Sequence, residues 1–297
     1  MIDLHSHTNE SDGSCSPVEL IEEALRAGIR VLGVTDHDTL AGYYKAVAVA
    51  HDAGLELVCG IELSTKLHGR SAHLLGYFLS DGGPAPDFRE WILEMQTARR
   101  DRNVRLIARL QALGFDITLE EVQARGRGLT ARPHFAQVML EKGYVTTLQQ
   151  AFDDYLDESA KGYVYRREPQ FAEAVERIRN AGGIASLAHP VRVHGDVPAL
   201  MPELCAAGLN AIEVYHSDHT AQHVELYLAL ARRHGLSITG GSDFHGSTKP
   251  GLMLGSGRNG NLKIPPDLLD KLRLAHPPAA WKRPEATYRA HESELQS

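Results

Sequence analysis

Cysteine is scarce in this 297-residue chain, which contains three, at positions 15, 59 and 205. Three scattered cysteines without CxxC spacing cannot form a disulfide framework. The chain also lacks any run of about 18 or more apolar residues, so no membrane span is expected. The first residues, MIDLHSHTNESDGS, turn polar at residue 3 and do not resemble a signal peptide. The cytoplasm is therefore the expected compartment.

Positive charge is in deficit, with 31 Lys and Arg against 38 Asp and Glu for a net charge of −7. A protein that coats nucleic acid needs a basic surface, so stable binding of duplex nucleic acid is not expected. The 43% hydrophobic and 23% charged content is ordinary for a globular protein. The length suits one large domain, or a core domain with an insertion.

Histidine, in contrast, is plentiful at 16 residues, and many histidines follow short apolar runs. Such runs at 2–4, 31–34, 55–58, 184–187, 211–214 and 237–239 lead into HSH, TDHD, CGIE, AHP, YHSDH and GGSDFH. Helical segments separate several of these runs; Ser16, Pro17 and Glu19 form a capping-box start, and Gly28 provides a stop. The alternation predicts βα units, and at least six of them favour an α/β barrel over an open sheet. In either fold, ligands bind at the carboxyl edge of the strands.

The stretch 99–168 interrupts this rhythm with helical patterning and no convincing strand. It carries 12 Lys and Arg against 10 Asp and Glu, whereas the rest of the chain is acidic. We expect a first barrel part at 1–98, an inserted helical substrate-capping subdomain at 99–168, and a second barrel part at 169–297. The last part ends in a polar tail from about residue 277.

The histidines and carboxylates at the strand ends have the spacing of metal ligands. His5 and His7 are two residues apart, as are Asp243 and His245, so in extended chain each pair projects to one face. Asp12 follows in the loop next to the first pair, and further candidates are His37, Glu62 and His189 at other strand ends and His73 in an apparent hairpin. A single loop histidine is usually solvated, so the coincidence of so many motifs at one sheet edge is what favours a metal site.

Imidazole and carboxylate donors without thiolate suit Mn²⁺, Zn²⁺ or Fe²⁺. Nine ligands are too many for one ion and sufficient for two or three if Glu62 bridges. Such a cluster lowers the pKa of a bridging water and clamps the oxygens of a phosphoryl group. Phosphate esters are therefore the substrate class that the cluster fits best.

Six motifs together resemble the PHP (polymerase and histidinol phosphatase) family of metal-dependent phosphoesterases. They are HSHTNESDGS at 5–14, GVTDHDT at 33–39, GIE at 60–62, AHLLGY at 72–77, SLAHP at 186–190 and GSDFHG at 241–246. The resemblance implies a distorted (β/α)7 barrel with two or three divalent ions, Mn²⁺ foremost. It also implies nine metal ligands, all present here: His5, His7, Asp12, His37, Glu62, His73, His189, Asp243 and His245.

The resemblance further suggests how the ligands divide among the ions. One ion would be held by His5, His7, Glu62 and Asp243, with Glu62 bridging to a second ion on His73 and His189. Asp12, His37 and His245 would lie on a third side, and Asp12 and His37 are counted among the catalytic residues.

The helical insertion resembles that of the nucleotide-directed branch, which includes 3′,5′-nucleotide bisphosphate phosphatases and small 5′-to-3′ exoribonucleases. Within it, Arg132 offers a bidentate fork for a phosphate that is not cleaved, and His134 lies beside it. His194, five residues past His189, is a candidate for touching phosphate or protonating the leaving oxygen. The alternative is that Arg132 is a surface residue that binds no substrate.

Two other groups of residues are not expected to form a functional site. His216, His219 and His223 have the spacing of one helix face, but no carboxylate partner is evident, so no second metal site is expected. The basic run of Arg99, Arg100, Arg102, Arg105 and Arg109 predicts a solvated helix surface that at most guides an anionic substrate.

The leading functional hypothesis is hydrolysis of the 3′-phosphate of a nucleoside 3′,5′-bisphosphate. Trimming of short 5′-phosphorylated oligonucleotides and hydrolysis of histidinol phosphate are alternatives within the same chemistry. A C–N amidohydrolase is disfavoured because no lysine stands at a strand end, and a non-catalytic binding module because no ligand position has decayed. The oligomeric state is not indicated by the sequence.

Overall fold

A computed structural model of the chain describes residues 1–80, 83–126 and 128–277. The polar tail expected from about residue 277 therefore lies almost wholly outside the described residues. Among the helices of the described residues, none is both long and apolar enough to cross a membrane.

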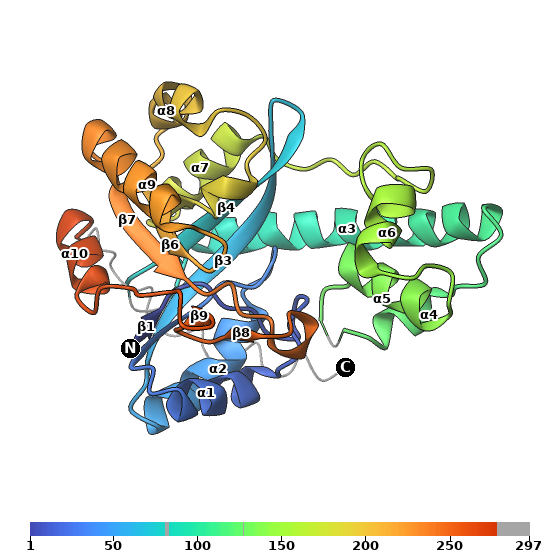
Figure 1. Cartoon of the computed structure of the whole chain (residues 1–297), viewed down its shortest axis with the longest axis horizontal. Coiled ribbons are helices and arrows are strands. Elements are labelled where there is room, and N and C mark those ends of the chain that lie inside the picture. The colour runs from blue at the N-terminus through green and yellow to red at the C-terminus, as the bar shows by residue number, and fades with distance from the viewer. Residues whose placement is uncertain (81–82, 127, 278–297) are drawn as a thin grey trace.

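Seven strands form one sheet in which neighbours in the chain are also neighbours in space (Figure 1). All pairs are parallel except the two that involve the fourth strand, which forms an antiparallel hairpin with the third. The strands are β1 (Ile2–Asp3), β2 (Val31–Val34), β3 (Glu56–Leu67), β4 (Arg70–Phe78), β5 (Ile184–Leu187), β6 (Ala211–His216) and β7 (Ser237–Gly241).

The sheet closes where the chain that follows β1 meets the chain that follows β7. The backbone N–H of Asp243 donates to the carbonyl of His5 at 2.9 Å, and that of His7 donates to the carbonyl of Phe244 at 2.8 Å. Ser6 and Phe244 form a parallel bridge between these bonds. The prediction of a distorted (β/α)7 barrel rather than an open sheet is confirmed: the barrel is nearly closed.

Two glycines allow the chain at β1 to lie close to both of its neighbours. A Cβ atom on Gly241 of β7 would lie 2.3 Å from the backbone nitrogen of His5, and one on Gly33 of β2 would lie 2.6 Å from the carbonyl oxygen of Leu4. Side-chain carbons do not approach other atoms so closely, so both positions require glycine. The segment that bears His5 is thus held between two strands.

Helices cover the outside of the barrel (Figure 1). They are α1 (Pro17–Arg26), α2 (Ala41–Asp52), α7 (Phe171–Asn180), α8 (Val197–Ala206), α9 (Ala221–His234) and α10 (Leu268–Ala275). The start of α1 confirms the expected capping box, because the Ser16 hydroxyl accepts from the N–H of Glu19 and the Glu19 carboxylate accepts from the N–H of Ser16. Apolar residues of α7 such as Val175 and Ile178 pack with Leu63 of β3 in the main core.

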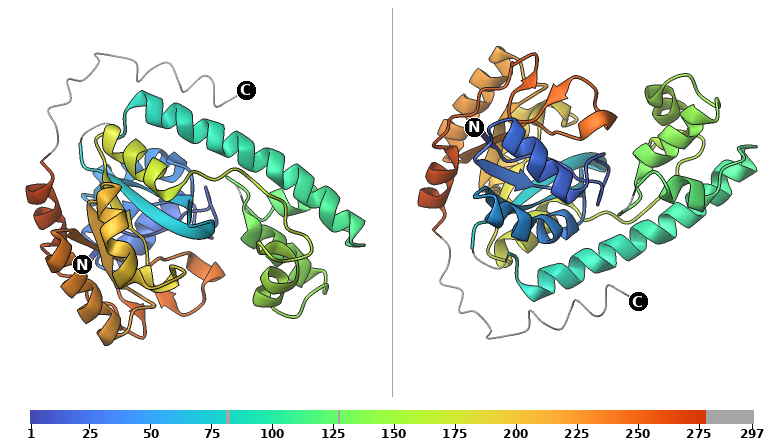
Figure 2. Two further views of the ribbon diagram at one scale, coloured as in Figure 1. Left: turned by 90° about the horizontal axis from the view of Figure 1, so that it is seen from above. Right: turned by 90° about the horizontal axis from the view of Figure 1, so that it is seen from below.

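A helical lobe stands beside the barrel at one end of a long helix (Figure 2). Its elements are α3 (Pro86–Ala112), α4 (Leu119–Gln123), α5 (Arg132–Glu141), α6 (Leu148–Ala151) and a π-helical turn at Phe152–Leu156. The lobe has a hydrophobic core of its own, which includes Leu110, Phe135 and Met139.

Helix α3 connects the two parts of the molecule. Phe88 and Trp91 near its start are buried in the barrel core, whereas Leu106 and Leu110 near its end are buried in the lobe core. The helix begins at Pro86, before the insertion boundary expected at residue 99. The domain boundaries inferred from the sequence stay predictions.

Gly241→Ala should lower the free energy of unfolding by about 1–3 kcal/mol, the usual cost of overpacking a tight site. The added methyl group would lie 2.3 Å from the backbone nitrogen of His5, closer than van der Waals contact, and would push β7 away from that segment. Urea unfolding followed by circular dichroism measures the effect. An unchanged unfolding midpoint would show that the closure of the barrel does not depend on this close approach.

Candidate metal centre

All nine expected ligands lie at the carboxyl end of the strands or in the loops and hairpin that follow. His5, His7 and Asp12 come after β1, His37 after β2, Glu62 from β3, His73 from β4, His189 after β5, and Asp243 and His245 after β7. Most are buried; His73 is the most accessible, with 30% of its side chain exposed.

The carboxylate of Glu62 is the centre of this cluster. Its Oε1 atom lies 2.9 Å from Nδ1 of His73 and 2.8 Å from Nε2 of His189. Its Oε2 atom lies 3.1–3.3 Å from ring nitrogens of three further histidines, His5, His7 and His37. Each oxygen therefore faces a separate set of imidazoles, which is the arrangement that a bridging carboxylate requires.

Asp243 and Asp12 complete the cluster on the side of β1 and β7. Asp243 Oδ1 lies 3.5 Å from Nε2 of His5 and 3.4 Å from Nε2 of His7. Asp12 Oδ1 lies 3.3 Å from Nε2 of His245. The Oδ2 atom of Asp243 contacts two basic side chains instead, with Nη1 of Arg192 at 2.9 Å and Nζ of Lys249 at 2.7 Å.

Three groups of these residues bring their ligand atoms within 4.8 Å of one another, a spacing at which each group could hold an ion. The groups are His5, His7, Glu62 and Asp243; His37, Glu62 and His73; and His7, Asp12, His37 and His245. The first contains the four residues that the resemblance assigns to one ion. In the second, His37 takes the place expected for His189, although His189 also contacts Glu62.

The pKa values of His37, His189 and Glu62 suit metal binding. Burial lowers the pKa of His37 to about 3 and that of His189 to about 4, so both are neutral at pH 7. Burial lowers the pKa of His5 and His7 too, but the carboxylates around them outweigh it and raise the pKa of His7 to about 9 and that of His5 well above its usual value. Burial would raise the pKa of Glu62, but the surrounding imidazoles hold it well below its usual value. Neutral imidazole and ionised carboxylate are the forms that bind a divalent cation.

Two further observations fit a cation at this position. Both ring nitrogens of His7 and Nδ1 of His37 are buried without a hydrogen-bond partner among the described residues, and such groups are costly to leave unsatisfied. The backbones of Asp38, His189 and Asp243 have positive φ values of 53°, 25° and 59°, a conformation that non-glycine residues rarely adopt. Strain of this kind concentrates at functional sites.

An arginine cluster, formed by Arg99, Arg102, Arg132 and Arg166, is connected to the histidines through Asp38, the residue after His37. The buried carboxylate of Asp38 pairs with Arg99 of α3, and its Oδ2 atom lies 3.4 Å from Nη2 of Arg166. Arg99 and Arg102 are each 5% exposed, so the expectation of a solvated basic helix surface is wrong for these two residues. They lie in the middle of α3, which runs from the barrel to the lobe (Figure 2).

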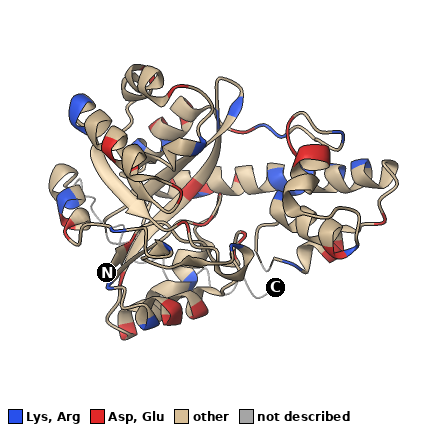
Figure 3. Cartoon of the chain, in the orientation of Figure 1, with Lys and Arg blue, Asp and Glu red and all other residues tan. Residues whose placement is uncertain are grey.

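Arg102 is the least compensated member of this cluster. Burial, and then the charges of Arg99, Arg132 and Arg166, hold its pKa well below the usual range. In the part of the chain that the structure describes, Arg102 makes no hydrogen bond or ion pair, and its Nε is buried without a partner. In Figure 3, blue segments, which mark Lys and Arg, lie along the part of α3 beside the lobe.

The comparisons with known proteins agree with this geometry. A family model, the PHP domain, matches residues 3–181. The chain is 32% identical to a 5′-3′ exoribonuclease of Haemophilus influenzae, over 82% of this chain and 89% of that one. It is 31% identical to a 3′,5′-nucleoside bisphosphate phosphatase of Chromobacterium violaceum, over 86% of this chain and 90% of the relative.

The chain belongs to the PHP domain family. A solved structure from Bifidobacterium adolescentis, named by inference as a metal-dependent phosphoesterase, has a TM-score of 0.79 at 30% identity and covers 92% of this chain and 96% of its own. The protein is thus a metal-dependent phosphoesterase, with the clustered histidines and carboxylates as its candidate metal-binding groups.

The three residues expected to bind substrate in this PHP protein lie in different surroundings. Arg132 is half-buried, donates to the carbonyl of Leu156 at 3.3 Å and belongs to the arginine cluster. His134 uses its Nδ1 to accept from the N–H of Ala131, so this nitrogen caps α5. His194 is exposed and, within the described residues, makes no hydrogen bond or ion pair. Its catalytic role stays a prediction.

Strand β6 holds functional candidates that the sequence did not reveal. Glu213 and His216 are buried, and their ligand atoms lie within 4.8 Å of one of His5. His216 therefore has carboxylate neighbours, which the sequence analysis did not find; its Nε2 lies 3.5 Å from Asp243 Oδ2. The charged residue in the apolar run AIEVYH was the available signal. Lys249 was missed because it follows β7 by several residues.

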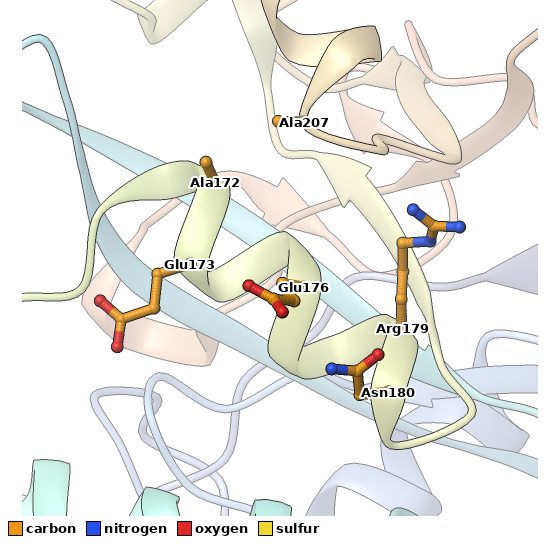
Figure 4. A pocket seen from close by; sticks show the side chains of 6 residues that line it. All are labelled: Ala172, Glu173, Glu176, Arg179, Asn180 and Ala207. Carbon is orange, nitrogen blue, oxygen red and sulfur yellow. The ribbon is translucent and has the colours of Figure 1, made fainter.

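A surface hollow lies away from the PHP site, on the outer face of α7 (Figure 4). It is lined by Ala172, Glu173, Glu176, Arg179, Asn180 and Ala207. None of these residues is a candidate ligand or a member of the arginine cluster, so the hollow is not part of the site.

Asp38→Asn should lower the free energy of unfolding of the metal-free protein at pH 7 by about 3–5 kcal/mol, because buried Arg99 loses its anion. Burial raises the pKa of Asp38, but Arg99 and Arg166 outweigh it and bring the pKa from 3.8 to about 2. The carboxylate therefore contributes stability above about pH 4 and loses it as the pH falls towards 2. Urea unfolding of both proteins should show their difference shrinking over that range.

Asp52→Asn is the control for this prediction, because the side chain of Asp52 is 85% exposed. Its free energy of unfolding should stay within about 0.5 kcal/mol of the wild type at every pH. A similar loss in both variants would mean that Asp38 is not the anchor of the arginines.

Proposed function

We propose that this phosphoesterase hydrolyses the 3′-phosphate of nucleoside 3′,5′-bisphosphates and leaves a 5′-mononucleotide. The observation that carries the proposal is the buried guanidinium of Arg102, which has no hydrogen bond or ion pair among the described residues and lies in the arginine cluster that Asp38 connects to the metal centre. A buried cation without a counter-charge is unfavourable, so the site favours a ligand that brings a second anion. A bisphosphate supplies one phosphate for cleavage and another for the arginines.

The nine expected ligands would hold two or three divalent ions, with Mn²⁺ the expected metal and Zn²⁺ or Fe²⁺ compatible with the same donors. When bound, such ions lower the pKa of water and neutralise the oxygens of a phosphoryl group. Glu62 would bridge two ions, since its two oxygens face separate sets of histidines. Asp12 and His37 lie on the side that faces the lobe loop, where Leu129 N–H donates to the carbonyl of Glu10 at 2.7 Å.

The arginines are prepared for a phosphate by the residues around them. Asp38 holds Arg99 and Arg166, and Glu168 accepts from Nη2 of Arg166 at 2.9 Å. Arg102 and half-buried Arg132 are then available to bind the phosphate. Arg102 has no ion pair among the described residues, and Arg132 has only Asp157, at 3.9 Å. A guanidinium held in advance loses less entropy when it binds.

Removal of nucleotides from short 5′-phosphorylated oligonucleotides is the second candidate. It would place the 5′-phosphate on the same arginines and the first phosphodiester at the metal centre. The similarity to an exoribonuclease favours it. Histidinol phosphate has one phosphate and would bring no second anion to Arg102.

Adenosine 3′,5′-bisphosphate should release phosphate with added Mn²⁺ at a higher kcat/KM than histidinol phosphate, and 5′-AMP should release none. A 5′-phosphorylated dinucleotide in the same panel tests the second candidate by release of a mononucleotide. Exhaustive treatment with a chelator should abolish all turnover, and Mn²⁺ should restore it. Turnover by thoroughly demetallated protein would refute the metal-dependent chemistry.

Arg102→Ala should raise the KM for adenosine 3′,5′-bisphosphate about 10- to 100-fold, as expected for the loss of a hydrogen bond to a charged group. An aryl monophosphate does not reach the arginines, so its KM should change little. Arg132→Ala should act in the same direction.

Arg100→Ala is the matched control, since Arg100 lies on the same helix but is exposed. It should leave both substrates nearly unaffected. An Arg102→Ala variant with equal losses on both substrates would remove this arginine from the second phosphate site.

A further inference from the structure

Strand β6 contributes none of the nine expected ligands, yet it places a carboxylate against two of them. Glu213 lies in the middle of β6 and is completely buried. Its Oε1 atom is 2.9 Å from Nδ1 of His5, and its Oε2 atom is 2.6 Å from the backbone nitrogen of His189. A single carboxylate thus contacts two residues that follow different strands.

The contact with His5 determines which ring nitrogen carries hydrogen. An ionised carboxylate only accepts hydrogen bonds, so Nδ1 of His5 must be the donor. In the neutral ring, Nε2 then keeps its lone pair. That nitrogen lies 3.2 Å from Glu62 and 3.5 Å from Asp243, on the side of the candidate ion.

The contact with His189 acts on the backbone instead of the ring. His189 has a φ of 25°, which is strained for a residue with a side chain. The hydrogen bond from its N–H to Glu213 opposes relaxation of this conformation. The ring of His189 consequently keeps its Nε2 atom 2.8 Å from Glu62 Oε1.

We propose that Glu213 is a positioning residue of the metal centre, which holds the tautomer of His5 and the backbone of His189 and thereby strengthens ion binding on both sides of Glu62. This inference rests on the ligand set proposed above. Partners behind a metal-bound histidine typically change metal affinity or activity by about 10- to 100-fold.

Glutamine cannot replace Glu213 in this arrangement. Both contacts are donors to the carboxylate, one on each oxygen. An amide has one acceptor oxygen and one NH₂ donor, so in either orientation it faces one of the two donors with a second donor. Glu213→Gln therefore keeps the shape of the side chain and loses one contact and the charge.

Asp3 provides a matched control within the same barrel. It is also a fully buried carboxylate, and it accepts from the backbone N–H groups of His5, Ser242 and Gly255. It has no hydrogen bond to an imidazole among the described residues. Asp3→Asn therefore removes a buried carboxylate next to His5 without changing what the ring contacts.

The experiment measures the affinity of the metal-free proteins for Mn²⁺ by competition with a chelating dye, together with the melting temperature before and after Mn²⁺ is added. Glu213→Gln should weaken Mn²⁺ binding about 10- to 100-fold and reduce the rise in melting temperature. Asp3→Asn should lower the melting temperature of the metal-free protein and keep its Mn²⁺ affinity within about twofold of the wild type.

His5→Ala separates the inference from the ligand set on which it rests. If His5→Ala binds Mn²⁺ as the wild type does, the ligand set itself is wrong and the inference falls with it. If His5→Ala weakens binding and Glu213→Gln does not, only the role of Glu213 is overturned. Equal weakening by Glu213→Gln and Asp3→Asn would also overturn it, because general loosening of the barrel would then account for the effect.

A Glu213→Gln protein that does not accumulate in folded form is replaced by Glu213→Asp. Its shorter carboxylate keeps the charge but cannot reach both donors. Weaker Mn²⁺ binding by this variant supports the inference, and wild-type affinity overturns it.

Discussion

The carboxylate of Glu62 is the interaction around which the site is organised. It contacts five imidazoles that follow or lie in four different strands, so no two neighbouring segments alone could create this arrangement. The buried carboxylates of Asp12, Asp243 and Glu213 add further negative charge around it. Arg192 and Lys249 contact Asp243, and the remaining negative charge is what divalent ions would balance.

Backbone contacts at the closure of the barrel hold several of these groups in place. The chain at His5 lies between β2 and β7 at spacings that only glycine permits, and its carbonyl accepts from Asp243. Residues 5 and 243 are remote in sequence, yet the backbone hydrogen bonds at the closure bring their side chains together. The same closure explains why two pairs spaced two residues apart converge on one point.

Asp38 joins the metal centre to the arginine cluster, which lies between the barrel and the lobe. Its N–H donates to the carbonyl of Glu62 at 3.0 Å, while its side chain pairs with Arg99 of α3. A change in the position of α3 would therefore shift Asp38, whose backbone is hydrogen-bonded to Glu62. Asp38, whose backbone φ is positive, thus connects the helix that bears the lobe to the metal centre.

Much of this molecule was predictable from local sequence. The spacing of His5 and His7 after a short apolar run, the capping box at Ser16 and the polar ends of the apolar runs are local patterns, and they indicated the strands, the helix and the candidate ligands. Periodicity did not reveal that Arg99 and Arg102 are buried, because an arginine-rich helix face usually indicates solvent. Nor did it reveal the contacts of Glu213, which lies within a strand.

The sequence by itself determined which chemical groups stand at the carboxyl ends of the strands, since strand and turn propensities act over a few residues. Only the tertiary structure decided which of those groups meet, which charges are buried and which of the buried arginines has no ion-pair partner among the described residues. Closure of the sheet and the path of α3 depend on contacts between residues far apart in the chain, such as His5 with Gly241. Burial and electrostatic environment follow from those contacts, so local sequence patterns do not encode them.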